Sequence, residues 1–368
     1  MTTAAPAILL TPGPLTTRLE TRQAMLRDWG SRDEAFIALT AEMRRRLLAL
    51  AGGGDSHAAV PLQGSGTFIV EATIATLVGP ADHLLVLVNG AYGERIAAIA
   101  RRLGRRVDVL TWEEDQPVSP ASVDRALAEN PAITHVALVH CETTTGLLNP
   151  LAEIAALTSR HGKALLVDAM SSFGALPIDL KAHPVAAVMA SSNKCLEGVP
   201  GLGFALIERR TLAAAKGNCP SLSLDLHDQW QGFETNGQWR FTPPVQVVAA
   251  LVAALRQLEA EGDPPARLRR YRANFDTLAA GMAEMGFRLF LDAAVQAPII
   301  ATFHSPAEPW FRFDGFYRAL AGRGFLIYPG KLSRADSFRI GCIGAIEPAD
   351  FQRLLEAIAA IVDEMKTA

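Results

Sequence analysis

The sequence predicts an α/β protein with a large, mostly parallel sheet flanked by helices, followed by a smaller α+β unit. Between about residues 60 and 210, apolar runs of strand length alternate with amphipathic stretches of helical period. After the GDPP segment at 262–265 the order changes, and helices alternate with pairs of strands. We therefore expect an N-terminal arm (1–18), a large domain (19–260) and a small C-terminal domain (261–368).

In the large domain, five apolar runs have the length of buried strands: 83–88, 134–140, 163–169, 185–191 and 203–208. Stretches with helical period lie between or beside them, at 67–79, 94–104, 150–162 and 245–260. The helix after residue 149 has clear boundary signals, since Asn149 can cap it, Pro150 suits its first turn and Gly162 can end it.

In the small domain, the pattern predicts helices at 266–285, 313–322 and 348–365. It predicts strands at 287–291, 298–303, 325–328 and 337–341. The chain contains no internal repeat and no low-complexity tract, so these elements should form one α+β unit.

Composition excludes several classes of protein. The chain has 368 residues, is 49% hydrophobic and carries a net charge of −3, which together exclude a disordered chain. Lys and Arg are spread along it, so we expect neither a nucleic acid nor a membrane partner. No apolar run approaches the roughly 18 residues of a membrane span, and the N-terminus lacks a secretory signal pattern. Four cysteines without a CxxC pair argue against disulfides and zinc, so we expect a cytoplasmic protein without a metal.

Four polar features lie where the predicted strands and helices meet, the region in which open α/β sheets bind ligands. The QGSGT segment at 63–67 opens a helix, where glycines and free N–H groups favour a phosphate. Asp168 and Lys194 each follow an apolar strand directly, and Arg339 lies in the predicted strand SFRIG. Taken singly, each feature also has an ordinary structural interpretation: a turn, a helix cap, a solvated side chain or a surface ion pair.

Taken together, the four features suit pyridoxal phosphate. This cofactor needs a lysine for its Schiff base, a carboxylate on the pyridinium nitrogen and a cradle for its phosphate. The carboxylate keeps the ring nitrogen protonated, so the ring can accept electrons from the substrate. Desolvation and the nearby cationic ring help the lysine to lose its proton. The QGSGT segment lacks the GK[ST] ending of a P-loop and is not a full GxGxxG, which argues against a nucleotide.

Several segments of the chain, taken together, resemble those of a known family. The segments SGT (65–67), ETTTG (142–146), VDAMSS (167–172) and NK (193–194) resemble the class-V, fold-type I aminotransferases, which use pyridoxal phosphate. Four further segments are more specific: LLTPGPLTT (9–17), SLSLDLHDQW (221–230), WRFTPP (239–244) and YPGKL (328–332). They resemble members that transfer the amino group of 2-aminoethylphosphonate to pyruvate. The resemblance covers nearly the whole chain and implies release of phosphonoacetaldehyde and L-alanine, a step of phosphonate breakdown.

The resemblance also assigns roles to residues around the cofactor. Lys194 would form the Schiff base and shuttle the proton, and Asp168 would pair with the pyridinium nitrogen. The phosphate would be held by Ser65, Gly66, Thr67 and Asn193, joined by Thr242 from a neighbouring subunit. The ring would be contacted by Tyr92 stacked on one face, Met170 on the other, and Thr143 (or Thr145) at its hydroxyl.

For the substrate, the resemblance implies that the Arg339 guanidinium binds the carboxylate of pyruvate or alanine through two parallel hydrogen bonds. Thr16 and Thr17 of the arm would donate near the substrate. Arg18 departs from the small polar residue expected there, and we expect it to point to solvent. The implied partners are small anionic substrates and a second copy of the chain, in a homodimer with shared active sites.

Rival interpretations remain open from the sequence. A transaminase of the same class could use alanine or serine with glyoxylate. Cys195 beside the lysine could suggest a cysteine desulfurase, although such a thiol normally lies on a mobile loop. A dinucleotide-dependent oxidoreductase or a non-catalytic cofactor-binding module would come from another class. Measuring which amino donors change the spectrum of the cofactor would separate these possibilities.

Overall fold

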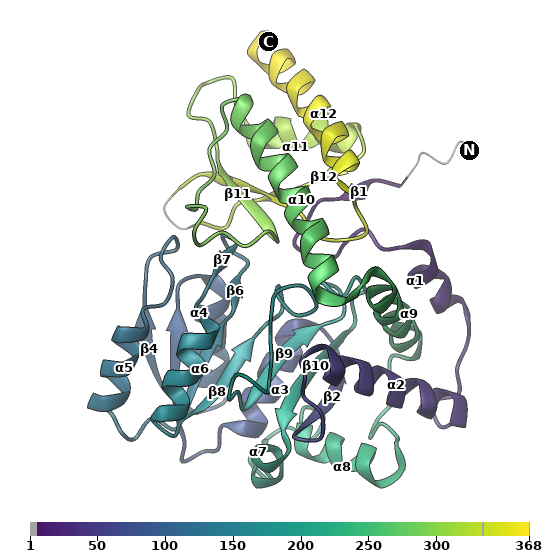
Figure 1. Ribbon diagram of the computed structural model, residues 1–368, viewed down its shortest axis with the longest axis vertical. Helices are drawn as coiled ribbons and strands as arrows, with labels where there is room; N and C mark the ends of the chain where they lie inside the picture. Colours follow the sequence, from purple (N-terminus) through teal and green to yellow (C-terminus); the bar gives the residue numbers. More distant parts are fainter. Residues whose placement is uncertain (1–5, 333–334, 368) are drawn as a thin grey trace.

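A seven-stranded sheet forms the centre of the molecule in the computed structural model, which describes residues 6–332 and 335–367 (Figure 1). Its strand order is β2-β10-β9-β8-β5-β3-β4, and only β10 runs antiparallel to its neighbours among the described strands. The expectation of a mostly parallel sheet is therefore confirmed. The strands are β2 (His57–Gln63), β3 (His83–Val88), β4 (Arg106–Thr111), β5 (His135–Val139), β8 (Ala164–Asp168), β9 (Ala187–Ser191) and β10 (Leu202–Glu208).

Helices cover both faces of this sheet, because the central strands are apolar on both sides. In β3, Leu85 and Leu87 belong to one buried cluster, whereas Leu84, Val86 and Val88 belong to the other. The first cluster is completed by α2 (Glu34–Leu50), α5 (Pro120–Glu129), α6 (Leu151–Arg160) and α9 (Val245–Glu261). The second is completed by α3 (Gly66–Leu77), α4 (Ala91–Arg102), α7 (Arg209–Ala214) and α8 (Leu226–Asn236). The result is a three-layer arrangement.

The C-terminal part has its own core. A three-stranded antiparallel sheet of β11 (Ile300–His304), β14 (Ser337–Gly341) and β13 (Tyr328–Pro329) packs with α10 (Asp263–Glu284), α11 (Phe313–Gly322) and α12 (Pro348–Thr367). Phenylalanines dominate this core, for example Phe303 stacked on Phe338 with ring centroids 5.6 Å apart. The exact limits of the arm and of the two domains stay a prediction.

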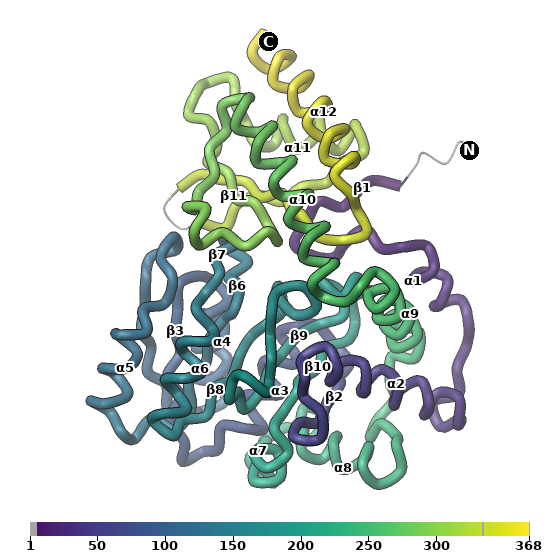
Figure 2. The backbone as a smooth tube through the Cα atoms, viewed as in Figure 1, coloured from purple at the N-terminus to yellow at the C-terminus, as the bar shows by residue number. Residues whose placement is uncertain are grey.

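The N-terminal segment lies against this C-terminal part. Strand β1 (Ile8–Leu9) pairs in parallel with β12 (Phe325–Leu326), and the two chain segments run side by side in Figure 2. From there the chain continues into α1 (Leu19–Gln23) and the 3₁₀ turn η1 (Ala24–Leu26), which pack near α9. Residues 10–17 are therefore held between the two parts of the molecule.

Several sequence expectations need correction. Residues 287–291 form no strand, since only the isolated bridge between Leu289 and Phe303 occurs there. The expected strand 325–328 is divided into β12 and β13. Asn149 does not cap α6, because its side chain donates to the oxygen of Val139 at 2.8 Å and accepts from the N–H of Val118 at 2.9 Å. The GDPP segment ends α9 at Gly262, and its prolines form the first turn of α10.

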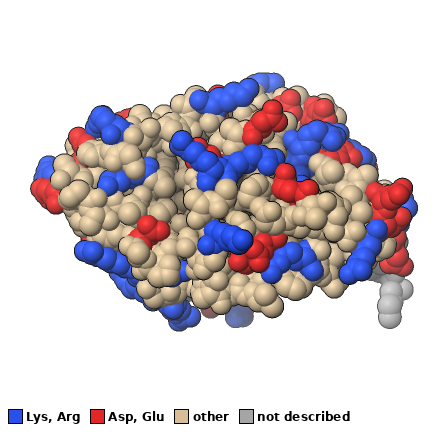
Figure 3. Space-filling view, turned by 90° about the horizontal axis from the view of Figure 1, so that it is seen from below, with Lys and Arg blue, Asp and Glu red and all other residues tan. Residues whose placement is uncertain are grey.

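The surface has no strongly one-signed face in the view of Figure 3, where acidic and basic side chains are interspersed. Among the helices of the described residues, none is both long and apolar enough to cross a bilayer. All four cysteines are free thiols, and three of them are buried.

Candidate active site

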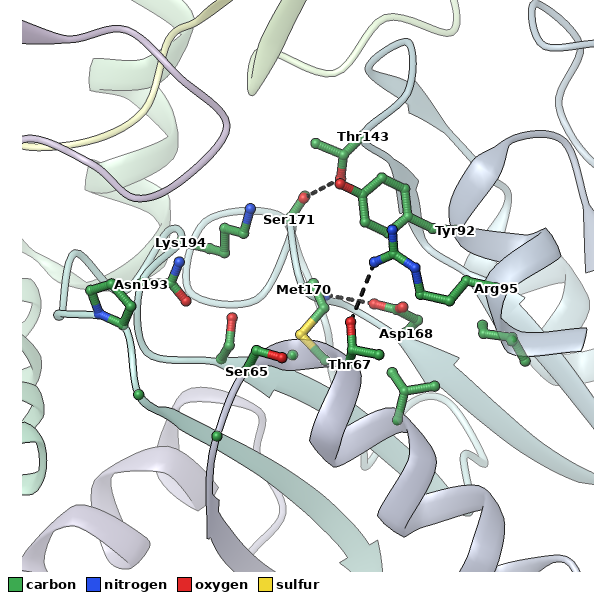
Figure 4. Close-up of a pocket in the computed structure, with 17 residues that line it drawn as sticks. Ser65, Thr67, Tyr92, Arg95, Thr143, Asp168, Met170, Ser171, Asn193 and Lys194 are labelled. Atoms are coloured by element: carbon green, nitrogen blue, oxygen red, sulfur yellow. Dashed lines mark hydrogen bonds between the residues drawn. The ribbon is translucent and has the colours of Figure 1, made fainter. Parts of the chain in front are cut away.

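A cavity of about 420 Å³ lies where β8 and β9 end and α3 begins (Figure 4). Most of the residues singled out from the sequence line it: Ser65, Gly66, Thr67, Tyr92, Thr143, Asp168, Met170, Asn193 and Lys194. Figure 4 shows Lys194 on one side of the cavity and Tyr92, Arg95 and Asp168 on the other. The topology of the sheet explains why residues from separate loops line one cavity. The carboxyl ends of neighbouring parallel strands lie at one edge of the sheet.

The start of α3 is built to receive an anion. Ser65 is the N-cap in an extended conformation, and its side chain makes no capping hydrogen bond. Its hydroxyl and the first N–H groups of the helix are therefore available to a ligand at the positive end of the helix dipole. A Cβ at Gly66 would lie 2.7 Å from the sulfur of Met170, so a larger residue there would displace the Met170 side chain. Gly64, just before it, has φ +124°, which also favours glycine.

Asp168 ends strand β8 and is only 4% exposed. One carboxylate oxygen accepts a hydrogen bond from the N–H of Met170 at 3.0 Å. Burial raises the pKa of Asp168 to about 6, because the charged form is poorly solvated there. A cationic group in the cavity would restore the charged form, which is the role that the sequence predicts for this residue.

Lys194 follows β9 and lies under the N-terminal arm. Its Nζ donates to the main-chain oxygen of Pro12 at 2.5 Å, and a Cβ at Gly13 would lie 2.8 Å from its side chain. Burial lowers the pKa of the Lys194 amine to about 8, and the positive charges of Arg339 and Lys331 act in the same direction. The amine is thus much closer to its neutral, nucleophilic form at physiological pH than an exposed lysine.

Two basic residues that the sequence analysis did not single out also belong to the site. The Arg95 guanidinium lies 4.8 Å from the centroid of the Tyr92 ring, and Arg95 Nη1 donates to Thr67 Oγ1 at 3.3 Å. The Lys331 amine lies 5.2 Å from the same ring. Arg95 follows Tyr92 by three residues on α4, a spacing that places both on one face of the helix. Ser171 and Ser191, which also line the cavity, carried no comparable signal.

Arg339 lies beside the cavity rather than in its lining. It is 2% exposed on β14, where Nε donates to the oxygen of Pro329 and Nη1 to that of Thr143, both at 3.0 Å. No carboxylate of the described residues forms an ion pair with it. Burial lowers the pKa of the guanidinium. A buried arginine without an acidic partner fits an anion-binding role better than an ordinary surface ion pair.

Three residues implied by the resemblance do not meet the cavity within this chain. Thr16 Oγ1 accepts from the N–H of Leu9 at 2.8 Å, and the main-chain oxygen of Thr17 accepts from Arg22. Thr242 is exposed in the loop before α9. Pro12 and Gly13, rather than the threonines, are therefore the arm residues that contact Lys194. Arg18 is exposed, as expected.

Cys195 and the SLSLDLHDQW segment lie in structural rather than catalytic surroundings. Cys195 is fully buried, and burial raises its pKa to about 12, which does not suit a nucleophilic thiol. In the SLSLDLHDQW segment, Asp225 caps α8 by accepting from the N–H of Asp228 at 3.0 Å. Asp228 in turn pairs with Arg240 at 3.2 Å.

This fold and site define an aminotransferase of a known class. The class-V aminotransferase family matches residues 19–306, and the chain belongs to that family. Solved structures with the same fold include pyridoxamine–pyruvate aminotransferase from Mesorhizobium loti, with a TM-score of 0.91 at 26% identity over 100% of this chain and 94% of that one. Alanine–glyoxylate aminotransferase from Nostoc sp. has a TM-score of 0.91 at 26% identity, over 98% of this chain and 96% of that one. The expected fold-type I architecture is confirmed.

Curated relatives narrow the class further. A 2-aminoethylphosphonate–pyruvate transaminase from Pseudomonas putida is 56% identical over 359 residues, which cover 98% of both chains. One of the same name from Pseudomonas aeruginosa is 54% identical, over 100% of this chain and 99% of the relative. The resemblance to this group that the sequence segments indicated is therefore confirmed.

Proposed function

We propose that the chain is a pyridoxal-phosphate-dependent transaminase that moves the amino group of 2-aminoethylphosphonate to pyruvate. The products would be phosphonoacetaldehyde and L-alanine, in the breakdown of phosphonates. One observation carries the chemical part: a lysine with a lowered pKa and a buried aspartate line the same cavity, beside an uncapped helix N-terminus. The relatives at 54–56% identity support the choice of substrates.

The residues present fit this cofactor. Bound pyridoxal phosphate supplies an electron sink for the exchange of the amino group. The N-terminus of α3, with Ser65 and Thr67, is suited to hold the phosphate, and Asn193 lines the same cavity. Asp168 would keep a proton on the ring nitrogen. Lys194 would attach the cofactor and then carry a proton between the two carbon positions that exchange it.

The charges around the cavity suit small anionic substrates. Arg339, Lys331 and Arg95 lie near one another, and burial, followed by the positive charges of Arg339 and Arg95, lowers the pKa of Lys331. Burial raises the pKa of the nearby Glu142, and this single carboxyl group faces three basic side chains. Such an excess of positive charge favours a carboxylate or a phosphonate. Arg339 would bind the pyruvate carboxylate.

A homodimer would complete the site. Large apolar side chains are exposed at Phe68, Leu222 and Phe241, with exposed fractions of 53%, 73% and 48%. Phe68 adjoins Thr67 of the phosphate cradle, and Phe241 adjoins Thr242. An apolar surface of this kind typically forms an interface. It supports a shared site in which Thr242 of one copy reaches the phosphate of the other.

The free thiols support a reducing compartment, and we propose the cytoplasm. The alternative function is transfer from alanine or serine to glyoxylate. It rests on structural similarity at 26% identity and is supported less well than the phosphonate reaction.

Spectra of the purified holoenzyme test the proposal. On addition of 2-aminoethylphosphonate alone, we expect the cofactor absorbance to convert, and pyruvate should restore it. Conversion by serine but not by the phosphonate, with recovery on glyoxylate, would instead establish the alternative. Absence of any cofactor absorbance would contradict both.

A further inference from the structure

One face of α10 carries four buried polar side chains at helical spacing: Arg267, Arg270, Tyr271 and Asn274. Arg267, Tyr271 and Asn274 are fully buried, and the side chain of Arg270 is 8% exposed. A packed helix normally buries an apolar stripe, so each of these polar groups requires a partner. In Figure 1, α10 runs from the region of the large sheet into the C-terminal part.

The first set of partners is the lysine loop, residues 195–197 directly after Lys194. Arg267 Nη1 donates to the oxygen of Cys195 at 2.7 Å. Arg270 Nη2 and the Tyr271 hydroxyl both donate to Glu197 Oε1, at 2.8 and 2.7 Å. The N–H of Glu197 donates to the oxygen of Lys194 at 2.8 Å and closes a turn that begins at the lysine. The last residue of this turn, Glu197, is the one bonded to α10.

The backbone of Glu197 shows that this turn is held against its local preference. Its φ is +57°, in the left-handed region that a residue with a side chain rarely adopts. Glu197 is also 1% exposed, so its carboxylate depends on the groups of α10 for hydrogen bonds. The contacts with α10 therefore favour one conformation of the lysine loop.

The second set of partners follows β14, the strand that carries Arg339. Arg270 Nη1 donates to the oxygens of Gly344 and Ile346, at 2.6 and 3.0 Å. Asn274 Nδ2 donates to the oxygens of Cys342 and Ile346, both at 3.1 Å. The N–H of Ala345 donates to the oxygen of Thr16 in the arm at 2.8 Å. Arg270 thus contacts both the lysine loop and the segment after Arg339.

The buried charges of this cluster are balanced, and the exposed Glu347 adds a longer contact to Arg270 Nε at 3.7 Å. Glu261 accepts from Arg270 Nε at 2.8 Å and pairs with Arg267 Nη2 at 2.7 Å, so two guanidinium groups face Glu197 and Glu261. The two guanidinium groups lower the pKa of Glu261, while the two carboxylates raise the pKa of Arg270. Removal of one member would leave a buried charge without its partner, which is costly.

We propose that Glu197 and Arg270 are positioning residues, which set the place of the Lys194 amine relative to the Arg339 guanidinium. Lys194 lies in the loop after β9 of the large sheet and Arg339 on β14 of the C-terminal part. Arg270 is bonded to the segments that follow both. The inference deepens the proposed function, on which it rests, because it concerns the geometry between the cofactor lysine and the substrate-binding arginine.

The test compares four variants as purified holoenzymes: Glu197→Ala, Glu197→Gln, Arg270→Lys and the control Glu42→Ala. Glu197→Gln keeps an acceptor for Arg270 and Tyr271, whereas Glu197→Ala removes it. Glu42 also pairs with two arginines, Arg46 and Arg256, at 2.8 and 2.6 Å, but it lies on α2 rather than at the lysine loop. For each variant, kcat, the KM for pyruvate, the melting temperature and the pH at which the cofactor absorbance changes are measured.

In Glu197→Ala we expect kcat to fall at least about tenfold and the pyruvate KM to rise, because misplacement by about 1 Å is costly to catalysis. The pH of the absorbance change should also shift, since the surroundings of the amine change. Arg270→Lys cannot bridge both segments and should behave similarly. Glu197→Gln keeps the acceptor, so its kcat and pyruvate KM should lie closer to wild type than those of Glu197→Ala, while the lost charge lowers its melting temperature. Glu42→Ala should change neither the kinetics nor the absorbance transition.

The inference is overturned if Glu197→Ala or Arg270→Lys lowers only the melting temperature, with kcat, KM and the absorbance transition unchanged. If Glu197→Ala does not fold, Arg270→Lys, which keeps the charge, decides by the same criteria. Failure of the proposed function looks different, because the wild-type holoenzyme itself would then show no change of its absorbance on addition of 2-aminoethylphosphonate.

Discussion

Arg339 Nη1 donates a hydrogen bond to the main-chain oxygen of Thr143, 3.0 Å away. This bond joins β14 of the C-terminal part to the turn between β6 (Cys141–Glu142) and β7 (Leu147–Leu148), whose Thr143 lines the cavity. The side chain of Thr143 continues the contact, because Thr143 Oγ1 lies 2.5 Å from Ser171 Oγ in the segment after Asp168. The guanidinium that we expect to bind the substrate is thus oriented by the cavity wall.

Replacement of this arginine should affect pyruvate binding more than folding. In Arg339→Ala we expect a higher KM for pyruvate and a fall in kcat/KM on the order of 10² or more, since a buried charged contact is worth about 2–5 kcal/mol. Steady-state kinetics with pyruvate as the varied substrate measure this. Arg105→Ala is a matched control, because Arg105 is also buried and donates to two main-chain oxygens, outside the cavity. An unchanged KM in Arg339→Ala would show that another group binds the carboxylate.

Lys194→Ala should abolish turnover, because no other amine of the described residues lines the cavity. We expect a loss of kcat on the order of 10³ or more and loss of the absorbance of the covalently attached cofactor. Rate assays and absorbance spectra of the purified variant provide the measurement. Lys163→Ala is the control, since Lys163 likewise donates to a proline oxygen, at 2.8 Å, but on the surface. Normal kinetics in Lys194→Ala would rule out the assignment.

Asp168→Asn removes the charge while keeping the size of the side chain. We expect kcat to fall about 10²-fold or more, because a neutral amide stabilises a protonated ring nitrogen poorly. The half-reaction with 2-aminoethylphosphonate, followed in single turnovers, isolates this step. Asp225→Asn provides a control, since Asp225 also accepts from a main-chain N–H, at the start of α8. Equal rates in Asp168→Asn and wild type would remove the proposed role.

The lowered pKa of Lys194 predicts how cofactor capture depends on pH. The aldehyde reacts with the neutral amine, and a pKa of about 8 means that this form increases as pH rises through 8. After removal of the cofactor, the rate of its recapture should rise about tenfold from pH 7 to pH 9 and then level off. Stopped-flow absorbance would follow the reaction. A rate still rising steeply above pH 10 would indicate an ordinary lysine.

The fold was largely predictable where burial leaves a periodic pattern. The strand HLLVLV at 83–88 is buried on both faces, so it reads as one continuous apolar run. Strand β4 was missed because it lies at the sheet edge and alternates between exposed and partly buried residues. The stretch 287–291 has strand-like composition, but its pairing with β11 stops at one bridge, Leu289–Phe303, with one backbone hydrogen bond on each side of it.

Within the site, the residues that follow apolar strands were predictable, as Asp168 and Lys194 show. Arg95 and Lys331 were not, because their relevance comes from meeting at the ring of Tyr92 across a long sequence separation. The contact between Pro12 and Lys194 uses a main-chain oxygen and leaves no side-chain signal. Local patterns thus identified the chemical groups, while tertiary packing decided their surroundings.

The pairing of β1 with β12 has a consequence for biosynthesis. Residues 8–9 leave the ribosome early, yet their partner at 325–326 is translated only near the end. The segment that covers Lys194 therefore cannot dock until most of the chain has emerged. The bond from Lys194 to Pro12 thus belongs to the last stage of folding, when the two ends of the polypeptide come together.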